Sequence, residues 1–335
     1  MNTPASANRS FGYVRKALAL LMLTCQNTAL VLTLKFSYRK GAEPYLVSTV
    51  IVCSESLKLS LSLLLLAYTE GRSGVVAAVR ELRANSLRLI LPSALYLAQN
   101  SLLFCGIRLL TPTSYTVCSQ IKILTSAIFS VLLLNQKVTR RQYLALFALT
   151  VGMVMVQLED GASRGIAEGS HSTGSYQMNS SSLRGVLSVL AAALTSGFSG
   201  AYLERMYKEG SHANRTRTIW FRNAQLACIS VPLAVATAIY RDHESLQLHG
   251  AFQGCDTVVL FVVLLQAAGG MIVAFVLRYA GNILKCFAVS ISICVCVLVN
   301  IMSTPALPVK SGISIGVPIV ILSIFVYSSS PKKET

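Results

Sequence analysis

The sequence predicts an all-α integral membrane protein with ten transmembrane helices. Three observations predict this fold class. Hydrophobic residues make up 53% of the 335 residues and charged residues only 13%, against roughly 25% charged residues in a soluble domain. The mean hydropathy is +0.61. The apolar residues also gather in stretches of about 20, the length of helix that crosses the hydrocarbon core of a bilayer.

The strong positive charge fits a membrane protein better than a nucleic-acid-binding protein. The chain has 29 Lys and Arg against 13 Asp and Glu, which gives a net charge of +16. A soluble globule of this size would need more polar residues on its surface. Basic residues in short loops on one side of a bilayer account for the same charge. The composition therefore excludes a soluble nucleic-acid binder.

A long polar segment divides the apolar stretches into two groups of five. In chain order the predicted spans are 14–36, 45–67, 87–109, 114–134, 142–158, 183–203, 220–240, 257–277, 283–303 and 312–327. No small-residue cleavage site of a signal peptide accompanies the first span, so we expect it to be retained.

Five parts make up the predicted organisation. They are an N-terminal tail (1–13), a first five-helix repeat (14–158), a linker rich in Gly and Ser (159–182), a second five-helix repeat (183–327) and a C-terminal tail (328–335). Because five is odd, the second repeat must cross the membrane in the opposite sense to the first. Many secondary transporters are built from inverted repeats and bind substrate between them, near the midplane.

The loop charges orient these helices. With the N-terminus in the cytosol, most basic loop residues fall on the cytosolic side and most acidic ones on the opposite side. We therefore expect both tails in the cytosol and the 159–182 linker in the lumen.

The fourth predicted span carries a lysine in its interior. At 100° per residue, Lys122 shares an arc of about 80° with Tyr115, Ser119, Ser126 and Ser130. A charge this deep in lipid is costly and marks a functional position. We interpret Lys122 as a cation that binds an anionic substrate. The alternative is a buried lysine paired with a structural acid.

The ninth span repeats this feature in the second half of the chain. Lys285 lies near its cytosolic start. Two converging ammonium groups suit a ligand with about two negative charges, such as a phosphate-bearing molecule. The alternative for Lys285 is that its side chain snorkels to the membrane surface.

Other polar residues inside the spans extend the candidate site. Tyr96, Gln99 and Asn100 share one helix face, where a ring can stack on a base and amides can hydrogen-bond its edge; hydrogen bonds between helices are the alternative. Glu55 and Lys58 have i, i+3 spacing and are expected to form a structural or gating ion pair.

Two polar residues, Arg222 and Asn223, lie near the start of the seventh span. We expect Arg222 to anchor at the membrane interface and Asn223 to be a site residue. In the sixth span, Gly197 and Gly200 are predicted to allow close helix packing, as is Gly269 in the eighth.

Catalytic and metal-binding motifs are absent from the sequence. It has no nucleophile with a base, no paired carboxylates in a span, no HExxH or Walker motif and no cysteine pair with zinc spacing. We therefore expect no enzyme activity, no cofactor and no metal site.

Several segments carry a family resemblance. They are SESLK (54–58), LYLAQN (95–100), SQIKILTSAIFSVLLLN (119–135), GAYLER (200–205), WFRNAQ (220–225) and YAGNILKCFA (279–288). In this order they resemble the signature segments of the nucleotide-sugar transporters, above all the subgroup that moves UDP-galactose, UDP-N-acetylglucosamine or CMP-sialic acid. The resemblance extends from about Tyr13 to Tyr327.

The resemblance implies a ten-helix inverted-repeat fold that works by alternating access. It implies exchange of a cytosolic nucleotide sugar for a lumenal nucleoside monophosphate across the Golgi or ER membrane. The implied roles are phosphate binding by Lys122 and Lys285, and base and ribose contacts by Tyr96, Gln99, Asn100, Tyr115 and Asn223. Beside these we expect a supporting or gating role for Glu55, Lys58 and Ser119. Ser119 replaces a tyrosine that is usual in the animal members, which bears on base selectivity.

The expected substrate is a UDP-sugar, UDP-galactose first and UDP-N-acetylglucosamine second, with UMP as the exchange partner. The segment after Gln120 resembles the UDP-sugar members, and Ala227 and Ile229 stand where CMP-sialic acid transporters have a tyrosine and a serine. The alternatives are a CMP-sialic acid/CMP antiporter, a transporter of another organic anion, and a non-transporting membrane protein that senses nucleotides. A second copy of the chain is a further expected partner, in a homodimer.

Two short signals bear on location. Lys332 and Lys333 resemble the dilysine signal by which coat proteins return membrane proteins to the ER; the alternative is a solvated basic end. Asn179 begins an Asn-Ser-Ser glycosylation sequon in the expected lumenal linker. We expect a Golgi membrane protein that cycles through the ER or resides there.

Overall fold

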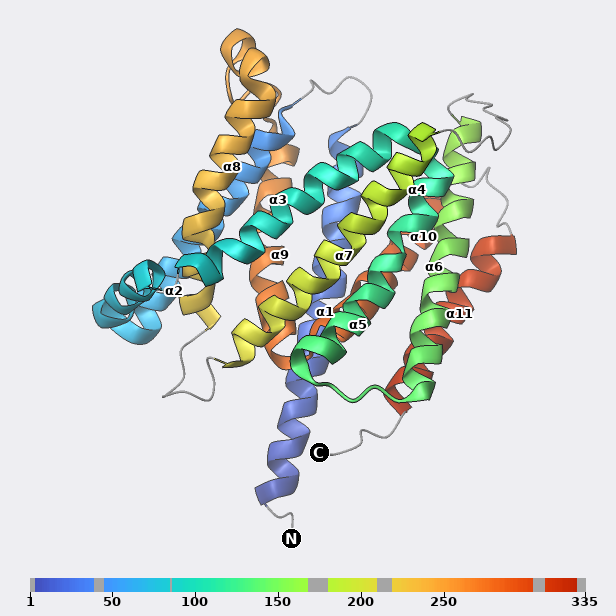
Figure 1. Cartoon of the computed structure of the whole chain (residues 1–335), viewed down its shortest axis with the longest axis horizontal. Helices are drawn as coiled ribbons and strands as arrows, with labels where there is room; N and C mark the ends of the chain where they lie inside the picture. The colour runs from blue at the N-terminus through green and yellow to red at the C-terminus, as the bar shows by residue number, and fades with distance from the viewer. Residues whose placement is uncertain are drawn as a thin grey trace. The chain divides into compact units, whose positions relative to one another are not determined.

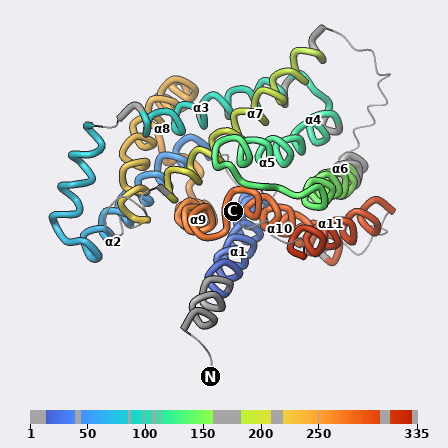
Figure 2. The backbone as a smooth tube through the Cα atoms, turned by 60° about the horizontal axis from the view of Figure 1, so that its bottom comes forward, coloured from blue at the N-terminus to red at the C-terminus, as the bar shows by residue number. Residues whose placement is uncertain are grey.

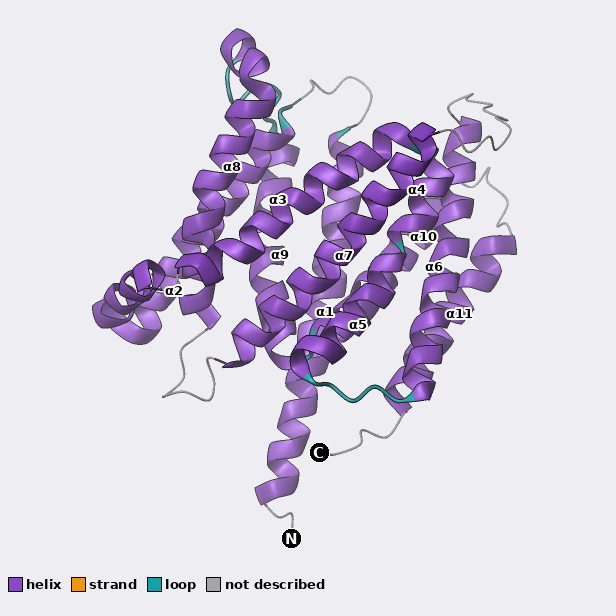
Figure 3. Cartoon of the chain, viewed as in Figure 1, coloured by secondary structure: helices purple, strands orange, loops and turns teal. Residues whose placement is uncertain are grey.

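The computed structural model describes residues 4–38, 45–84, 86–167, 180–209, 219–303 and 311–329. Regular secondary structure in these ranges is entirely α-helical (Figure 3). The helices are α1 (Pro4–Ser37), α2 (Val47–Ala84), α3 (Ser86–Leu109), α4 (Pro112–Ser119), α5 (Ile121–Leu134), α6 (Arg140–Ala167), α7 (Ser180–Glu209), α8 (Ile219–His249), α9 (Thr257–Tyr279), α10 (Asn282–Ser303) and α11 (Ser311–Ser329).

The helices bear out the predicted all-α membrane class. Within the described residues, nine spans are long and apolar enough to cross a membrane, with α4 and α5 counted together as one. The remaining predicted span, 87–109, coincides with α3.

The chain forms two compact units, and each contains segments from both halves of the sequence. Unit 1 comprises Met1–Ala94 and Met206–Gly281, and unit 2 comprises Leu95–Arg205 and Asn282–Thr335. Two boundaries between the units lie inside α3 and α7, and the third lies between α9 and α10. The units therefore differ from the two predicted five-helix repeats, and the inverted relationship of those repeats stays a prediction.

Unit 1 is built from α1, α2, α8 and α9. Helix α2 runs beside α8, and α1 packs on α9 (Figure 1). Two apolar clusters lie in this unit: one joins α2 to α9 around Val50 and Val262, and the other joins α2 to α8 around Leu66 and Phe221. The α1–α9 contact is close because Gly269 has no side chain: a Cβ there would lie 2.5 Å from the amide nitrogen of Gln26. The expected close packing at Gly269 is thus confirmed.

Unit 2 has its core between α5, α6, α10 and α11. Figure 2 shows α6 and α11 side by side, and α10 contacts α5, α6 and α11. Leu149 and Met153 of α6 are fully buried in this core together with Val320 of α11. Gly152 and Gly316 let the two backbones approach, since a Cβ on either would lie about 3 Å from the carbonyl oxygen of the other.

Several helices extend beyond the predicted spans. Helix α2 continues to Ala84 through a kink at Gly71, which has φ 68° and ψ −169°. Helix α6 continues into the expected linker as far as Ala167, and α1 includes most of the expected N-terminal tail. Apolar composition marks only the part of a helix that lies in lipid, whereas helix-forming residues such as Ala, Arg and Glu continue the helix in water.

The fourth predicted span is not one continuous helix, contrary to our expectation. Gln120 separates α4 from α5. Its N–H donates to Val117 O (3.2 Å) and its carbonyl oxygen accepts from Ile123 N (3.0 Å), so both hydrogen bonds join residues three apart. Its side chain is buried and donates to Gln157 Oε1 of α6 at 2.6 Å. The interruption thus coincides with a polar contact to another helix, which the local sequence does not reveal.

Candidate functional site

The two lysines predicted inside the spans both lie in unit 2. Lys122 is the second residue of α5 and is exposed, whereas Lys285 lies in the first turn of α10 and is half-buried. Their positive charges are near enough to interact with each other. The structure therefore places in one unit two lysines that are far apart in the sequence.

The chain turns sharply at Gly281, just before α10. Gly281 has φ 94°, a left-handed conformation that favours glycine. The N–H groups of Ala280 and Gly281 both donate to Val276 O at 2.8 Å and close the end of α9. Helix α10 begins at the next residue, so Lys285 is fixed within one helical turn of this glycine.

The sequence pattern does not predict the buried carboxylate of Glu204, whose charge acts on Lys285. Glu204 of α7 is fully buried and accepts two hydrogen bonds, from the backbone N–H of Asn282 at 2.7 Å and from Gln136 Nε2 at 2.9 Å. The N-terminus of a helix favours a negative charge, so Glu204 stabilises the start of α10. Its charge also attracts that of Lys285. The predicted sixth span ends at Leu203, one residue before Glu204, so hydropathy alone leaves this residue outside the span.

Asn282 connects this carboxylate to a close helix contact. Its side chain is fully buried, and neither amide atom has a hydrogen-bond partner among the described residues. A Cβ placed on Gly200 of α7 would lie 2.8 Å from Asn282 Nδ2. A Cβ placed on Gly197, one turn earlier, would lie 2.7 Å from the backbone carbonyl carbon of Thr125. The predicted close packing at both glycines is confirmed.

Replacing Gly200 with alanine is expected to destabilise the protein by about 1–3 kcal/mol, because overpacking a tight contact forces backbone shifts. The measurement is the unfolding temperature of the detergent-purified protein. Leu187→Ala on the exposed side of the same helix serves as the control and should have a smaller effect. An unchanged unfolding temperature in Gly200→Ala would contradict the close contact.

The residues expected to contact the base begin on α3. Tyr96 is exposed and Gln99 is half-buried, and both lie in unit 2. Asn100 lies on the same helix, but its side chain is outside the described residues. The exposed ring of Tyr96 is available for stacking on a planar ligand.

Helix α4 supplies the other two candidates of unit 2. Tyr115 is half-buried, with its ring about 3.6 Å from the position that a Cβ on Gly106 of α3 would occupy. The hydroxyl of Ser119 donates to Thr116 O at 2.8 Å. Ser130, farther along the predicted polar stripe, is fully buried and donates to its own helix backbone. Only the first part of the stripe is therefore accessible.

Asn223 lies in unit 1, at the start of α8. It is buried, and its Oδ1 accepts a hydrogen bond of 2.5 Å from the hydroxyl of Tyr207, while its Nδ2 has no partner among the described residues. The structure thus places this candidate in a different unit from Lys122 and Lys285, and its carbonyl oxygen is already bonded.

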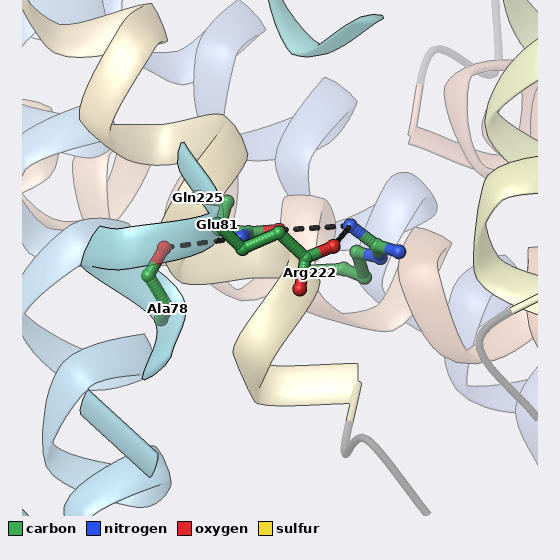
Figure 4. Close-up of polar contacts among 4 residues, drawn as sticks. All are labelled: Ala78, Glu81, Arg222 and Gln225. Carbon is green, nitrogen blue, oxygen red and sulfur yellow. Dashed lines mark hydrogen bonds and ion pairs between the residues drawn. The ribbon is translucent and has the colours of Figure 1, made fainter. Parts of the chain in front are cut away.

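Arg222 forms an ion pair between two helices of unit 1, and its expected position at the membrane interface stays a prediction. Its guanidinium donates to Glu81 Oε1 of α2 at 2.9 Å and to Gln225 Oε1 at 3.0 Å (Figure 4). Glu81 lies 141 positions earlier in the sequence, so local spacing gave no sign of the pair.

The expected Glu55–Lys58 ion pair is present in unit 1. Lys58 Nζ lies 2.5 Å from Glu55 Oε2. A Cβ on Gly270 of α9 would lie 2.9 Å from Lys58 Cδ, so the lysine stem packs against α9. This contact holds the pair between two helices of the same unit.

Three other predicted residues, Asn179, Lys332 and Lys333, lie outside the described residues. In the part of the chain that the structure describes, no group of three or more His, Cys, Asp or Glu side chains is placed to hold a metal ion. The charged residues described at the candidate site of unit 2 are Lys122, Lys285 and Glu204.

The family model described as nucleotide-sugar transporter matches residues 12–328. The chain belongs to the nucleotide-sugar transporter family. The resemblance seen in the sequence segments is thus confirmed, and the family consists of transporters, not enzymes.

Individual members of the nucleotide-sugar transporter family match nearly the whole chain. A UDP-N-acetylglucosamine/UDP-N-acetylgalactosamine transporter of Caenorhabditis elegans is 37% identical and covers 95% of this chain and 94% of its own. The UDP-N-acetylglucosamine transporter of Homo sapiens is 33% identical (95% and 96%), and the UDP-galactose transporter of Schizosaccharomyces pombe is 34% identical (97% and 90%). These relatives support a role in transport.

A solved crystal structure shares the fold of this family member. It aligns with a TM-score of 0.62 over 93% of this chain and 95% of the other chain, at 13% sequence identity.

Proposed function

We propose that the protein exchanges a UDP-sugar for UMP across the Golgi or ER membrane, with UDP-galactose as the preferred sugar nucleotide. The observation that carries the proposal is that Lys122 and Lys285, at the starts of α5 and α10, lie in the same unit. The diphosphate of a UDP-sugar carries about two negative charges, which two ammonium groups can neutralise through charge-assisted hydrogen bonds. The UDP-sugar transporters among the relatives support this substrate class.

The same charges give a physical reason for exchange. In an empty site the two ammonium groups repel each other, and the charge of Glu204 attracts that of Lys285. A UDP-sugar or UMP supplies similar negative charge and relieves the repulsion. The loaded protein should therefore change conformation more readily than the empty one, which couples entry of one nucleotide to exit of the other.

Nucleoside recognition is assigned to the remaining candidates. Tyr96 is exposed for stacking on uracil, and Gln99, Asn100 and Tyr115 supply hydrogen-bonding groups in the same unit. Asn223 offers the amide nitrogen that has no acceptor among the described residues. Glu55 and Lys58, joined to each other, are assigned a supporting or gating role together with Ser119.

UDP-N-acetylglucosamine is the second candidate substrate. Two relatives favour it: the Caenorhabditis elegans and Homo sapiens proteins, 37% and 33% identical to this chain, are both named as transporters of UDP-N-acetylglucosamine. The two sugar nucleotides share the uridine and the diphosphate, so the contacts proposed above serve both.

A proposed location and topology accompany this function. Both termini lie in the cytosol, Asn179 is glycosylated in the lumen, and Lys332 and Lys333 mediate coat-protein retrieval to the ER. A homodimer is proposed as the assembly. Protease accessibility of tags at the two termini in sealed microsomes tests the topology directly.

Proteoliposomes that contain the purified protein test the exchange. We expect preloading with UMP to stimulate uptake of labelled UDP-galactose most, UDP-N-acetylglucosamine next and CMP-sialic acid least. Empty vesicles and vesicles preloaded with CMP are the controls. Equal uptake into empty and UMP-loaded vesicles would exclude antiport, preferred uptake of CMP-sialic acid would overturn the substrate class, and binding without uptake would make the protein a sensor.

A further inference from the structure

Helix α2 continues beyond the membrane-spanning part of its sequence. At 1.5 Å per residue, the part from 47 to 70 is about 36 Å long, enough to cross a hydrocarbon core of about 30 Å. The left-handed Gly71 then turns the chain, and residues 72–84 form a second helical segment. We refer to residues 72–84 as the post-kink helix. Its position in the sequence places it where the chain leaves the hydrocarbon core.

One face of the post-kink helix is fixed against α8. Gly74 and Ala78 are buried, and Ala78 shares an apolar cluster with Phe221 and Ala224. Polar contacts reinforce this face. The carboxylate of Glu81 pairs with Arg222 at 2.9 Å, and Gln225 Nε2 donates to the carbonyl oxygen of Ala78 at 3.1 Å (Figure 4). These contacts fix the rotation of the post-kink helix about its axis.

The opposite face is basic and exposed. Arg72, Val76, Val79, Arg80 and Arg83 fall within an arc of about 100° at helical spacing, and all five are exposed. The two valines are 58% and 44% exposed. We refer to these five residues as the basic face.

Charge on the basic face has one sign. Glu81 is the sole acidic residue in the sequence 72–84, and it lies on the fixed face, paired with Arg222. The three arginines therefore point away from α8 without a carboxylate between them on the same face.

We propose that the basic face binds the headgroups of anionic phospholipids in the leaflet where α2 leaves the membrane core. A guanidinium donates paired hydrogen bonds to a phosphate. Valines between the arginines suit the boundary between headgroups and acyl chains, where amphipathic helices with a basic face lie. A free anion would need the arginines but not the exposed valines. The chemistry therefore points to a lipid surface.

The single tryptophan of the chain makes this binding measurable. Trp220 packs in the same cluster as Val75 and Ala78 of the post-kink helix. The full-length protein is reconstituted in phosphatidylcholine nanodiscs that contain a small fraction of dansyl-labelled phosphatidylserine or dansyl-labelled phosphatidylcholine. Energy transfer from Trp220 to dansyl reports which lipid gathers beside this helix.

We expect phosphatidylserine to be enriched over phosphatidylcholine about tenfold or more, since each arginine near an anionic surface contributes about fivefold. The triple variant Arg72→Ala/Arg80→Ala/Arg83→Ala should lose this enrichment, whereas three Arg→Lys replacements should keep most of it. Added salt should reduce the enrichment in the unmodified protein.

Three exposed basic residues elsewhere provide a matched control. Lys137→Ala/Arg140→Ala/Arg141→Ala removes the same charge from the region before and at the start of α6, and it should leave the enrichment at Trp220 unchanged. Equal losses in both triple variants, or no loss in the first, would overturn the proposal. Displacement of dansyl-phosphatidylserine by soluble UMP would also overturn it, because the face would then bind free phosphate. If the first triple variant unfolds, the charge reversal Arg80→Glu replaces it, with the same expected loss.

Discussion

Replacing Lys122 or Lys285 with alanine is expected to lower UDP-sugar exchange about tenfold to hundredfold, because a hydrogen bond to a charged group contributes about 1.5–3 kcal/mol. The two variants should differ in stability. Lys122 is exposed, so its removal should leave the unfolding temperature unchanged. Lys285 is half-buried and its charge interacts with the buried Glu204, so Lys285→Ala should lower the unfolding temperature as well.

Two measurements separate these effects. Exchange is followed in UMP-loaded proteoliposomes, and UMP binding is followed by calorimetry in detergent. Lys137→Ala, at an exposed position between α5 and α6, is the control and should behave like the unmodified protein. If the Lys122→Ala/Lys285→Ala double variant exchanged nucleotides at the full rate, neither lysine would bind substrate and the proposed site would be wrong.

Glu204→Ala is expected to be the most destabilising single replacement, because each hydrogen bond to its charged carboxylate contributes about 1.5–3 kcal/mol. The carboxylate is fully buried and accepts hydrogen bonds from Asn282 N and Gln136 Nε2. Alanine leaves both donors without this acceptor and leaves the charge of Lys285 without its opposite. The unfolding temperature of the purified protein measures the effect, with Glu244→Ala, whose side chain is 83% exposed, as the control.

Glu204→Gln separates charge from hydrogen bonding. Glutamine keeps one acceptor oxygen, so we expect a smaller loss of stability than with alanine. It also leaves two lysines without the opposing carboxylate, so UMP should bind more tightly and dissociate more slowly. A double-mutant cycle of Glu204→Gln with Lys285→Met measures the coupling between the two residues. A coupling of zero, or normal stability of Glu204→Ala, would contradict the role given to Glu204.

The sequence predicted the features that depend on local composition and spacing. Stretches of about 20 apolar residues located the spans, i, i+3 spacing predicted the Glu55–Lys58 pair, and small residues predicted the close contacts at Gly200 and Gly269. Each of these follows from one segment alone.

Features that depend on two distant segments could not be predicted in this way. The interruption at Gln120 accompanies a hydrogen bond to Gln157 on α6. Arg222 has its partner 141 positions away, and the carboxylate of Glu204 meets a backbone N–H 78 positions later. A hydropathy pattern contains no information on which polar group a buried side chain will reach.

The assembly of each unit from both halves of the chain has a consequence for synthesis of the protein on the ribosome. Glu81 lies 141 positions before its partner Arg222, and Gln26 lies 239 positions before the carbonyl of Leu265 to which it donates. At about 5–20 residues per second, the chain needs roughly 10–50 s to supply these partners. During that interval α1 and α2 are already made while their polar groups lack their final contacts. Unit 1 therefore completes its packing only after α8 and α9 have been translated, and nascent α1 and α2 need other polar partners until then.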